Sequence, residues 1–213
     1  MDIYASDDEK GEEIKQWWRD NGRSVIAACI LGALILISGR YWLDYKNTQS
    51  AHGSQAYQSV LLSLSSDEKT AAEDTTEQLF REFSNTPYAV FSAFEMATQA
   101  VEDKNNAAAQ MYLEWIINNA KLSAHKELAQ LRLAQSYFLG GEYEQALKLA
   151  DGQESTAFSS LWSELQGDIY VAQEKVNDAR KAYLSALSTS SQGEPRQQIL
   201  RVKLDDVVAS DNV

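Results

Sequence analysis

The sequence predicts an all-α protein in which a single N-terminal transmembrane helix precedes an α-solenoid of stacked helical hairpins. Residues 24–39 contain no charged side chain, and the 213 residues include only two prolines. Runs rich in Ala, Leu, Gln, Glu and Lys favour helices over strands. In the second half of the chain, small and aromatic residues recur at intervals of about 34 positions, which is typical of stacked helical repeats.

The uncharged run from Ser24 to Gly39 is the predicted membrane anchor. Sixteen residues at about 1.5 Å each fall short of a hydrocarbon core roughly 30 Å thick, so the flanks must extend the span. Arg23 and Arg40 can direct their charged ends outward along aliphatic stems. Aromatic residues that favour the headgroup region stand on both sides: Trp17, Trp18, Tyr41, Trp42 and Tyr45. We therefore assign residues 24–43 to a transmembrane anchor.

Two other interpretations of this run are weaker. A buried core helix would not need aromatic residues at both ends. A cleaved signal peptide would be followed by a small-x-small cleavage site, whereas bulky and charged residues follow here, at Arg40 to Leu43.

Positive charges near the anchor predict its orientation. Four precede it and two follow it: Lys10, Lys15, Arg19 and Arg23, then Arg40 and Lys46. Because cytoplasmic flanks carry the excess of Lys and Arg, residues 1–23 form a predicted acidic cytoplasmic tail. Its first 13 residues offer almost no apolar surface, so we expect them to be loosely ordered. The body of the protein, residues 44–213, is then exported.

Residues 44–213 are expected to form helices separated by short connectors. The anchor helix can continue to Leu64, the polar run 65–70 forms a turn, and a short helix covers residues 73–83. Thr86 is a predicted N-cap with Pro87 in the first turn of the next helix. Later connectors lie at 104–106, 140–141, 151–152 and 175–177, and Pro195 opens a C-terminal capping helix.

The recurring small residues keep one register through three copies. Ala97, Ala134 and Gly167 follow one another at intervals of 37 and 33 residues. Ala109, Ala146 and Ala179 repeat the same two intervals. Small side chains at such positions let two antiparallel helices approach closely. A single hairpin cannot bury its own apolar face, so the hairpins must stack.

The aromatic and glycine positions complete the pattern. Tyr137 and Tyr170 fill the space between helices, and Gly141 supplies a helix stop with positive φ. The first copy has Ala100 in place of the aromatic residue and Lys104 in place of the glycine. This pattern resembles the tetratricopeptide repeat.

In this repeat class the first helix of each hairpin lines a concave face. An apolar groove with a few polar groups suits extended or helical polypeptide segments. Two alternatives stay open: the rings can be core residues, and the helix that starts at Pro195 can fill the groove. The predicted protein-binding residues are Phe91, Phe94, Val101, Leu131, Gln135, Phe138, Asp168 and Val171.

The sequence favours an interaction protein over an enzyme, and we expect no catalytic, cofactor-binding or metal-binding residues. His52 and His125, the only histidines, stand in no metal-ligand spacing. The single Cys29 lies inside the apolar run and cannot form an intrachain disulfide. From Asp44 onward, 14 Lys or Arg stand against 24 Asp or Glu. This acidic surface disfavours nucleic acid as a partner.

The order of features along the chain matches one known family. An acidic N-terminal segment leads into an anchor that ends at Gly39–Trp42, a helix containing Ala56–Val60 follows, and repeat-like hairpins complete the chain. This combination resembles the YfgM family, ancillary subunits of the bacterial Sec translocon. The resemblance covers nearly the whole length.

The resemblance implies a single-pass inner-membrane protein with a periplasmic tetratricopeptide-like domain. It also implies association with the Sec translocon and with PpiD, a membrane-anchored periplasmic prolyl isomerase, and a chaperone-like role for unfolded exported proteins. The alternative is a cytoplasm-facing, membrane-tethered tetratricopeptide adaptor for a different complex.

Overall fold

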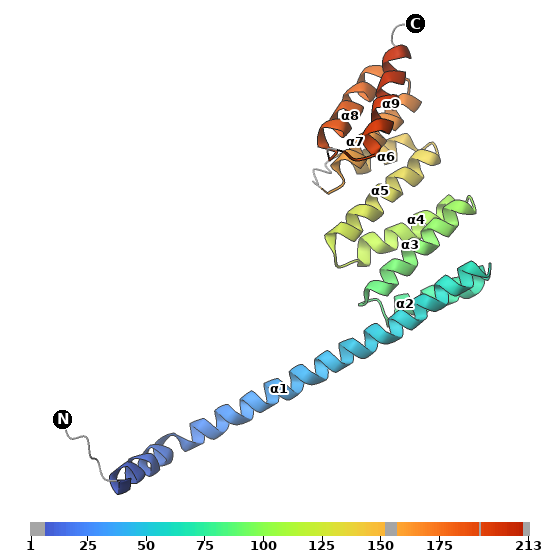
Figure 1. Cartoon of the computed structure of the whole chain (residues 1–213). Helices are drawn as coiled ribbons and strands as arrows, with labels where there is room; N and C mark the ends of the chain where they lie inside the picture. The colour runs from blue at the N-terminus through green and yellow to red at the C-terminus, as the bar shows by residue number, and fades with distance from the viewer. Residues whose placement is uncertain (1–6, 152–156, 192, 211–213) are drawn as a thin grey trace, which may run out of the picture. The chain divides into compact units, whose positions relative to one another are not determined.

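The computed structural model describes residues 7–151, 157–191 and 193–210, and within these residues all regular structure is α-helical (Figure 1). The helices, in chain order, are α1 (Asp7–Ser65), α2 (Lys69–Glu82), α3 (Pro87–Glu102), α4 (Asn106–Asn119), α5 (Ser123–Leu139), α6 (Tyr143–Ala150), α7 (Ser159–Ala172), α8 (Val176–Thr189) and α9 (Arg196–Ser210). The chain divides into two compact units, residues 1–51 and 52–213, and α1 passes through the boundary.

The first unit contains the apolar stretch of α1. This helix is long and apolar enough to cross a membrane. Its large apolar side chains are exposed, as Ile30 at 56% and Leu36 at 75% illustrate. A core helix of a soluble domain would bury one face, so the exposure fits a helix that meets lipid.

The N-terminal tail differs from the sequence-based expectation. The helix begins at Asp7, so loose order was the wrong prediction for residues 7–13, and residues 1–6 lie outside the described part. Glu12, Glu13 and Lys15 are strong helix formers. They extend a helix that the following apolar run already stabilises.

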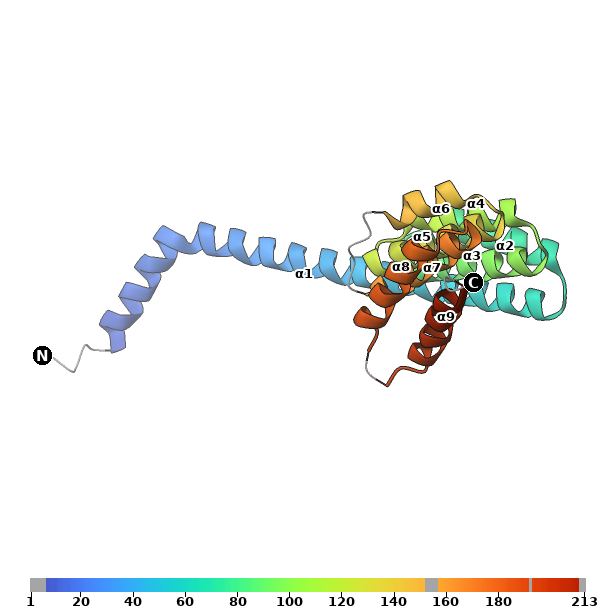
Figure 2. The same cartoon turned by 90° about the horizontal axis from the view of Figure 1, so that it is seen from above.

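Four helical hairpins stack in the second unit: the end of α1 with α2, then α3–α4, α5–α6 and α7–α8 (Figures 1 and 2). Their buried side chains form three clusters that follow one another along the stack. Helix α9 packs on the last hairpin through Leu200, 0% exposed, and Val207, 5% exposed. The fold is therefore the predicted helical solenoid.

All four hairpin turns have the same backbone conformation. One residue per turn has a positive φ of 58–78°: Asp67, Lys104, Gly141 and Glu174. The amide of the next residue donates to a carbonyl five positions back at 2.8–2.9 Å, in the pairs Glu68–Ser63, Asn105–Ala100, Glu142–Tyr137 and Lys175–Tyr170. This is the Schellman helix end. Only one of the four turns uses the glycine that makes it visible in sequence.

The hairpin of α1 and α2 was not predicted from the sequence as a repeat. Asp67 precedes Lys104 by the same 37 residues that separate Lys104 from Gly141. Val60 and Ala72 occupy the corresponding packing positions, and both are 0% exposed. Because the turn is shorter than expected, α2 begins at Lys69 rather than near Glu73.

The expected cap at Thr86 is also corrected. Thr86 stands at the N-cap of α3 with Pro87 next to it, but its side chain makes no capping hydrogen bond. Its Oγ1 instead donates to the carbonyl of Phe83 at 2.7 Å, so the side chain stabilises the turn before α3. At α4 the side chain of Asn105 does cap, accepting from the amide of Ala108 at 3.2 Å.

Small residues lie where the two helices of a hairpin touch. Ala109, Ala146 and Ala179 are all 0% exposed. A Cβ added at Gly167 would lie 2.4 Å from the Tyr183 ring, a distance that real carbon contacts do not show. The repeat alanines and this glycine are therefore packing residues.

Candidate functional site: a groove along α3, α5 and α7

Two adjoining hollows run along the first helices of the last three hairpins. A hollow of about 270 Å³ is lined from α3, α4 and α5 by Ala97, Thr98, Val101, Leu113, Arg132, Gln135, Ser136 and Leu139. The next, of about 260 Å³, is lined from α5, α7 and α9 by Gln135, Phe138, Leu139, Leu161, Glu164, Leu165, Asp168 and Arg196. Gln135 and Leu139 belong to both, so we treat the two hollows as one surface, called the groove below.

Four of the residues predicted from the repeat register line this groove: Val101, Gln135, Phe138 and Asp168. Val101 is 40% exposed and Leu139, which the sequence analysis did not select, is 66% exposed. Two exposed aliphatic side chains beside an amide make a surface that can bury apolar side chains and orient a peptide backbone.

Phe91 and Phe94, also predicted as groove residues, lie further toward the N-terminus in a chain of rings. The His125 ring lies edge-on to both, with centroid distances of 5.8 Å to Phe91 and 6.5 Å to Phe94. The guanidinium of Arg132 lies 5.0 Å from the centre of the Phe94 ring. Both phenylalanines are half-buried. Part of each ring packs inside the protein and part is exposed. The two phenylalanines are therefore neither purely core residues nor purely surface residues.

The last two predicted residues stand apart from the groove. Leu131 is 2% exposed and belongs to the core cluster that also contains Trp162 and Ile169. Val171 is 46% exposed. It lines a separate hollow of about 230 Å³ with Tyr183 and Lys203.

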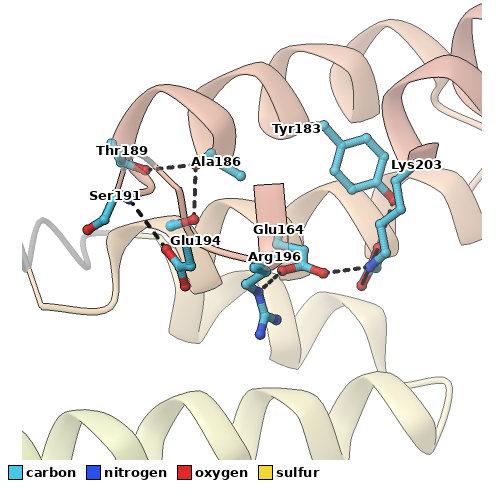
Figure 3. Close-up of polar contacts among 10 residues, drawn as sticks. Glu164, Tyr183, Ala186, Thr189, Ser191, Glu194, Arg196 and Lys203 are labelled. Atoms are coloured by element: carbon cyan, nitrogen blue, oxygen red, sulfur yellow. Dashed lines mark hydrogen bonds and ion pairs between the residues drawn. The ribbon is translucent and has the colours of Figure 1, made fainter. Parts of the chain in front are cut away.

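A cluster of charged side chains closes the C-terminal end of the groove (Figure 3). The Lys203 Nζ of α9 lies 2.8 Å from Glu164 Oε1, and 2.6 and 2.7 Å from the two carboxylate oxygens of Asp168. Arg196 Nε donates to the other oxygen of Glu164. The Tyr183 hydroxyl donates to Asp168 at 2.7 Å. Two acidic residues of α7 are thus matched by two cations of α9.

The protonation states in this cluster follow from its geometry. Burial alone would lower the pKa of Lys203, but its hydrogen bonds to Asp168 and Glu164 outweigh burial and raise the pKa above its ordinary value. Burial and the hydrogen bond to Asp168 raise the pKa of Tyr183. Lys203 therefore stays a cation, and Tyr183 stays a neutral donor.

The sequence analysis selected only Asp168 from this cluster. Glu164 is 6% exposed, yet one buried carboxylate among 24 acidic residues of the body carries no distinguishing pattern. A spacing of four residues between Glu164 and Asp168 places both on one face of α7. The partner cations on α9 become identifiable only when the helices are packed.

Helix α9 forms the end wall of the groove, because Arg196 lines the second hollow. The first hollow, beside Val101, has no residue from α9 in its lining. The last helix was expected to be able to fill the groove. It reaches only the C-terminal end of the groove and leaves the first hollow uncovered.

Among the described residues, no group of three or more His, Cys, Asp or Glu side chains is placed to hold a metal ion. His52 and His125 each lie against aromatic rings, His52 at 6.5 Å from Phe83 between centroids.

Known proteins match this chain over almost its whole length. The family model described as a tetratricopeptide repeat-like domain matches residues 15–209. A Haemophilus influenzae protein named ancillary SecYEG translocon subunit is 29% identical over 207 residues, covering 97% of this chain and 100% of the relative. Proteins of the same name from Neisseria gonorrhoeae and Escherichia coli K12 are 26% identical over 213 residues and 25% over 183 residues; the matches cover 97% and 86% of this chain, and 100% and 88% of the relatives.

Proposed function

The chain belongs to the tetratricopeptide repeat-like domain family, and from this membership we propose that it is an inner-membrane-anchored interaction subunit of the Sec translocon. Its helical domain faces the periplasm and assists the folding of newly exported proteins. Relatives named as ancillary translocon subunits, together with one apolar N-terminal helix, fit a single-pass inner-membrane protein.

The observation that carries this proposal is the groove. Its exposed aliphatic side chains, Val101 and Leu139, flank the amide of Gln135. Unfolded exported chains present apolar segments with unpaired backbone groups, and such a surface can bury the former and orient the latter. The prolyl isomerase PpiD is the second proposed partner, through the same domain.

The proposed orientation rests on the excess of Lys and Arg before residue 24. We expect alkaline phosphatase fused after Val213 to be active and a fluorescent protein fused at the same point to stay dark. The same two reporters at the N-terminus should give the opposite pattern and serve as the internal control. An inactive phosphatase with a bright C-terminal reporter would instead favour the cytoplasm-facing adaptor.

Client binding through the groove is tested by placing a charge in it. Leu139→Asp should weaken the crosslinking of an exported protein at least roughly tenfold, because losing one buried leucine contact removes about 1.5–3 kcal/mol. The unfolding midpoint should change little, since Leu139 is 66% exposed.

A matched control is Leu184→Asp on α8, where the side chain is 48% exposed and outside both hollows of the groove. Photocrosslinking in membranes, with a photoreactive residue at position 98, measures both variants. Equal crosslinking in the wild type and Leu139→Asp would count against the groove. An equal loss in Leu184→Asp would point to a general surface effect.

A further inference from the structure

Helix α9 contacts α7 through ion pairs and α8 through apolar packing. The hairpin helices meet at small residues such as Ala109, Ala146 and Ala179. In contrast, α9 meets α7 through two cations that reach two carboxylates, Lys203 and Arg196 to Glu164 and Asp168. The contact with α7 therefore depends on charge complementarity, whereas Leu200, 0% exposed, and Val207 pack against α8.

The surface beneath α9 is built to receive a helix. Leu200 follows Gly167 by 33 residues, the same interval that separates Gly167 from Ala134. Helix α9 thus occupies the place of the first helix of a further repeat. Within the described residues, α9 is the last helix.

Before α9, the Ser191 amide donates to Glu194 Oε2 at 3.3 Å, and Gly193 has a φ of +82°. If α9 leaves, Glu164 and Asp168 regain water, so the cost of separating the ion pairs is partly offset. The hairpin of α7 and α8 keeps its own contacts between Gly167 and Tyr183.

We propose that the carboxylates of Glu164 and Asp168, with the adjoining face of α8, form a docking site for a client helix that carries two cations on either side of an aliphatic residue, and that α9 is the intramolecular occupant which this helix displaces. The client helix needs the pattern that α9 shows. A cation stands at the first position, an aliphatic residue four positions later and a second cation three positions after that, as in Arg196, Leu200 and Lys203.

This inference rests on the proposed function in that the client arrives through the groove, whose end wall is α9. It adds the class of segment that is bound and the contact that controls access. A client helix with this pattern offers the same charges as α9. Because it is not tethered to α8 by a connecting segment, it can extend further along the groove.

The test uses the full chain in detergent micelles and a fluorescent synthetic peptide of residues 195–210. Lys203→Met removes one cation from α9 while keeping its aliphatic stem. Lys181→Met is the matched control, because Lys181 on α8 is 78% exposed and pairs with Asp178 of its own helix at 3.3 Å. A second peptide carries Glu at the positions of Arg196 and Lys203.

We expect amide hydrogen exchange in α9 to be at least tenfold faster in Lys203→Met than in the wild type or Lys181→Met. The peptide should bind Lys203→Met at least tenfold more tightly than it binds the other two chains, since it brings both cations back to the carboxylates. The charge-reversed peptide should not bind.

Three results would overturn the inference. One is unchanged exchange in α9 of Lys203→Met, and another is equal binding of the two peptides. The third is cooperative melting of α7 and α8 together with α9, which would make α9 part of one core. These measurements involve neither the translocon nor an exported protein. If the peptide binds as expected but photocrosslinking of an exported protein to the groove fails, the result counts against the proposed function alone.

Discussion

Replacing Leu131 by alanine should lower the free energy of unfolding by about 2–5 kcal/mol, the cost typical of a buried leucine. Leu131 is 2% exposed and packs with Ala134, Trp162 and Leu165 in the second core cluster. The neighbouring helices cannot close the resulting space, because each is fixed by its own hairpin turn. The substitution therefore leaves a cavity in the middle of the solenoid.

The matched control is Leu139→Ala on the same helix, where the side chain is 66% exposed. This change should stay within about 0.5 kcal/mol. Urea unfolding of the full chain in detergent, followed by far-UV circular dichroism, compares the two variants. Similar midpoints for both would mean that Leu131 does not belong to the core, and it would return as a candidate contact residue.

The second large effect is expected from Gly167→Ala. In an ordinary helix this change would stabilise by about 1 kcal/mol through helix propensity. Here the new Cβ would lie 2.4 Å from the Tyr183 ring, so we expect a loss of about 1–3 kcal/mol from overpacking. The sign alone separates the two effects.

The other repeats supply the compensating change. The positions that correspond to Gly167 and Tyr183 hold Ala97 with Leu113 in the first predicted copy. The double variant Gly167→Ala with Tyr183→Leu should therefore recover part of the lost stability. It cannot recover all of it, because the hydrogen bond from Tyr183 to Asp168 disappears. A double-mutant cycle of unfolding free energies measures the coupling, and a coupling near zero would contradict direct contact between the two residues.

Repeated small residues made most of the fold predictable. Ala109, Ala146 and Ala179 mark helix contacts because no larger side chain fits there. The hairpin of α1 and α2 escaped the sequence analysis since Asp67, not glycine, adopts the positive φ of its turn. A left-handed residue costs only about 1–2 kcal/mol, and the Schellman hydrogen bonds with the stacked hairpins suffice to hold it.

The groove was predictable in position but not in detail. Register along the first helix of each hairpin identified Gln135 and Phe138, because helical spacing fixes which residues share a face. The same register also selected Leu131, which the core covers. Whether a residue at the edge of such a face is buried depends on the size of the side chains that the neighbouring helix places over it. The spacing of residues along one helix does not contain that information.

By itself, the sequence determined the apolar helix, the hairpin register and the helical class, since each depends on local spacing and on side-chain size. Only the tertiary structure decided where α9 lies and which charges it meets. Glu164 and Lys203 are 39 residues apart. The partners of an ion pair recur at no fixed spacing along a sequence, so the spacing does not reveal this pair. Its partners are chosen by the packing of α9 across α7, where desolvation makes a carboxylate without a cation costly.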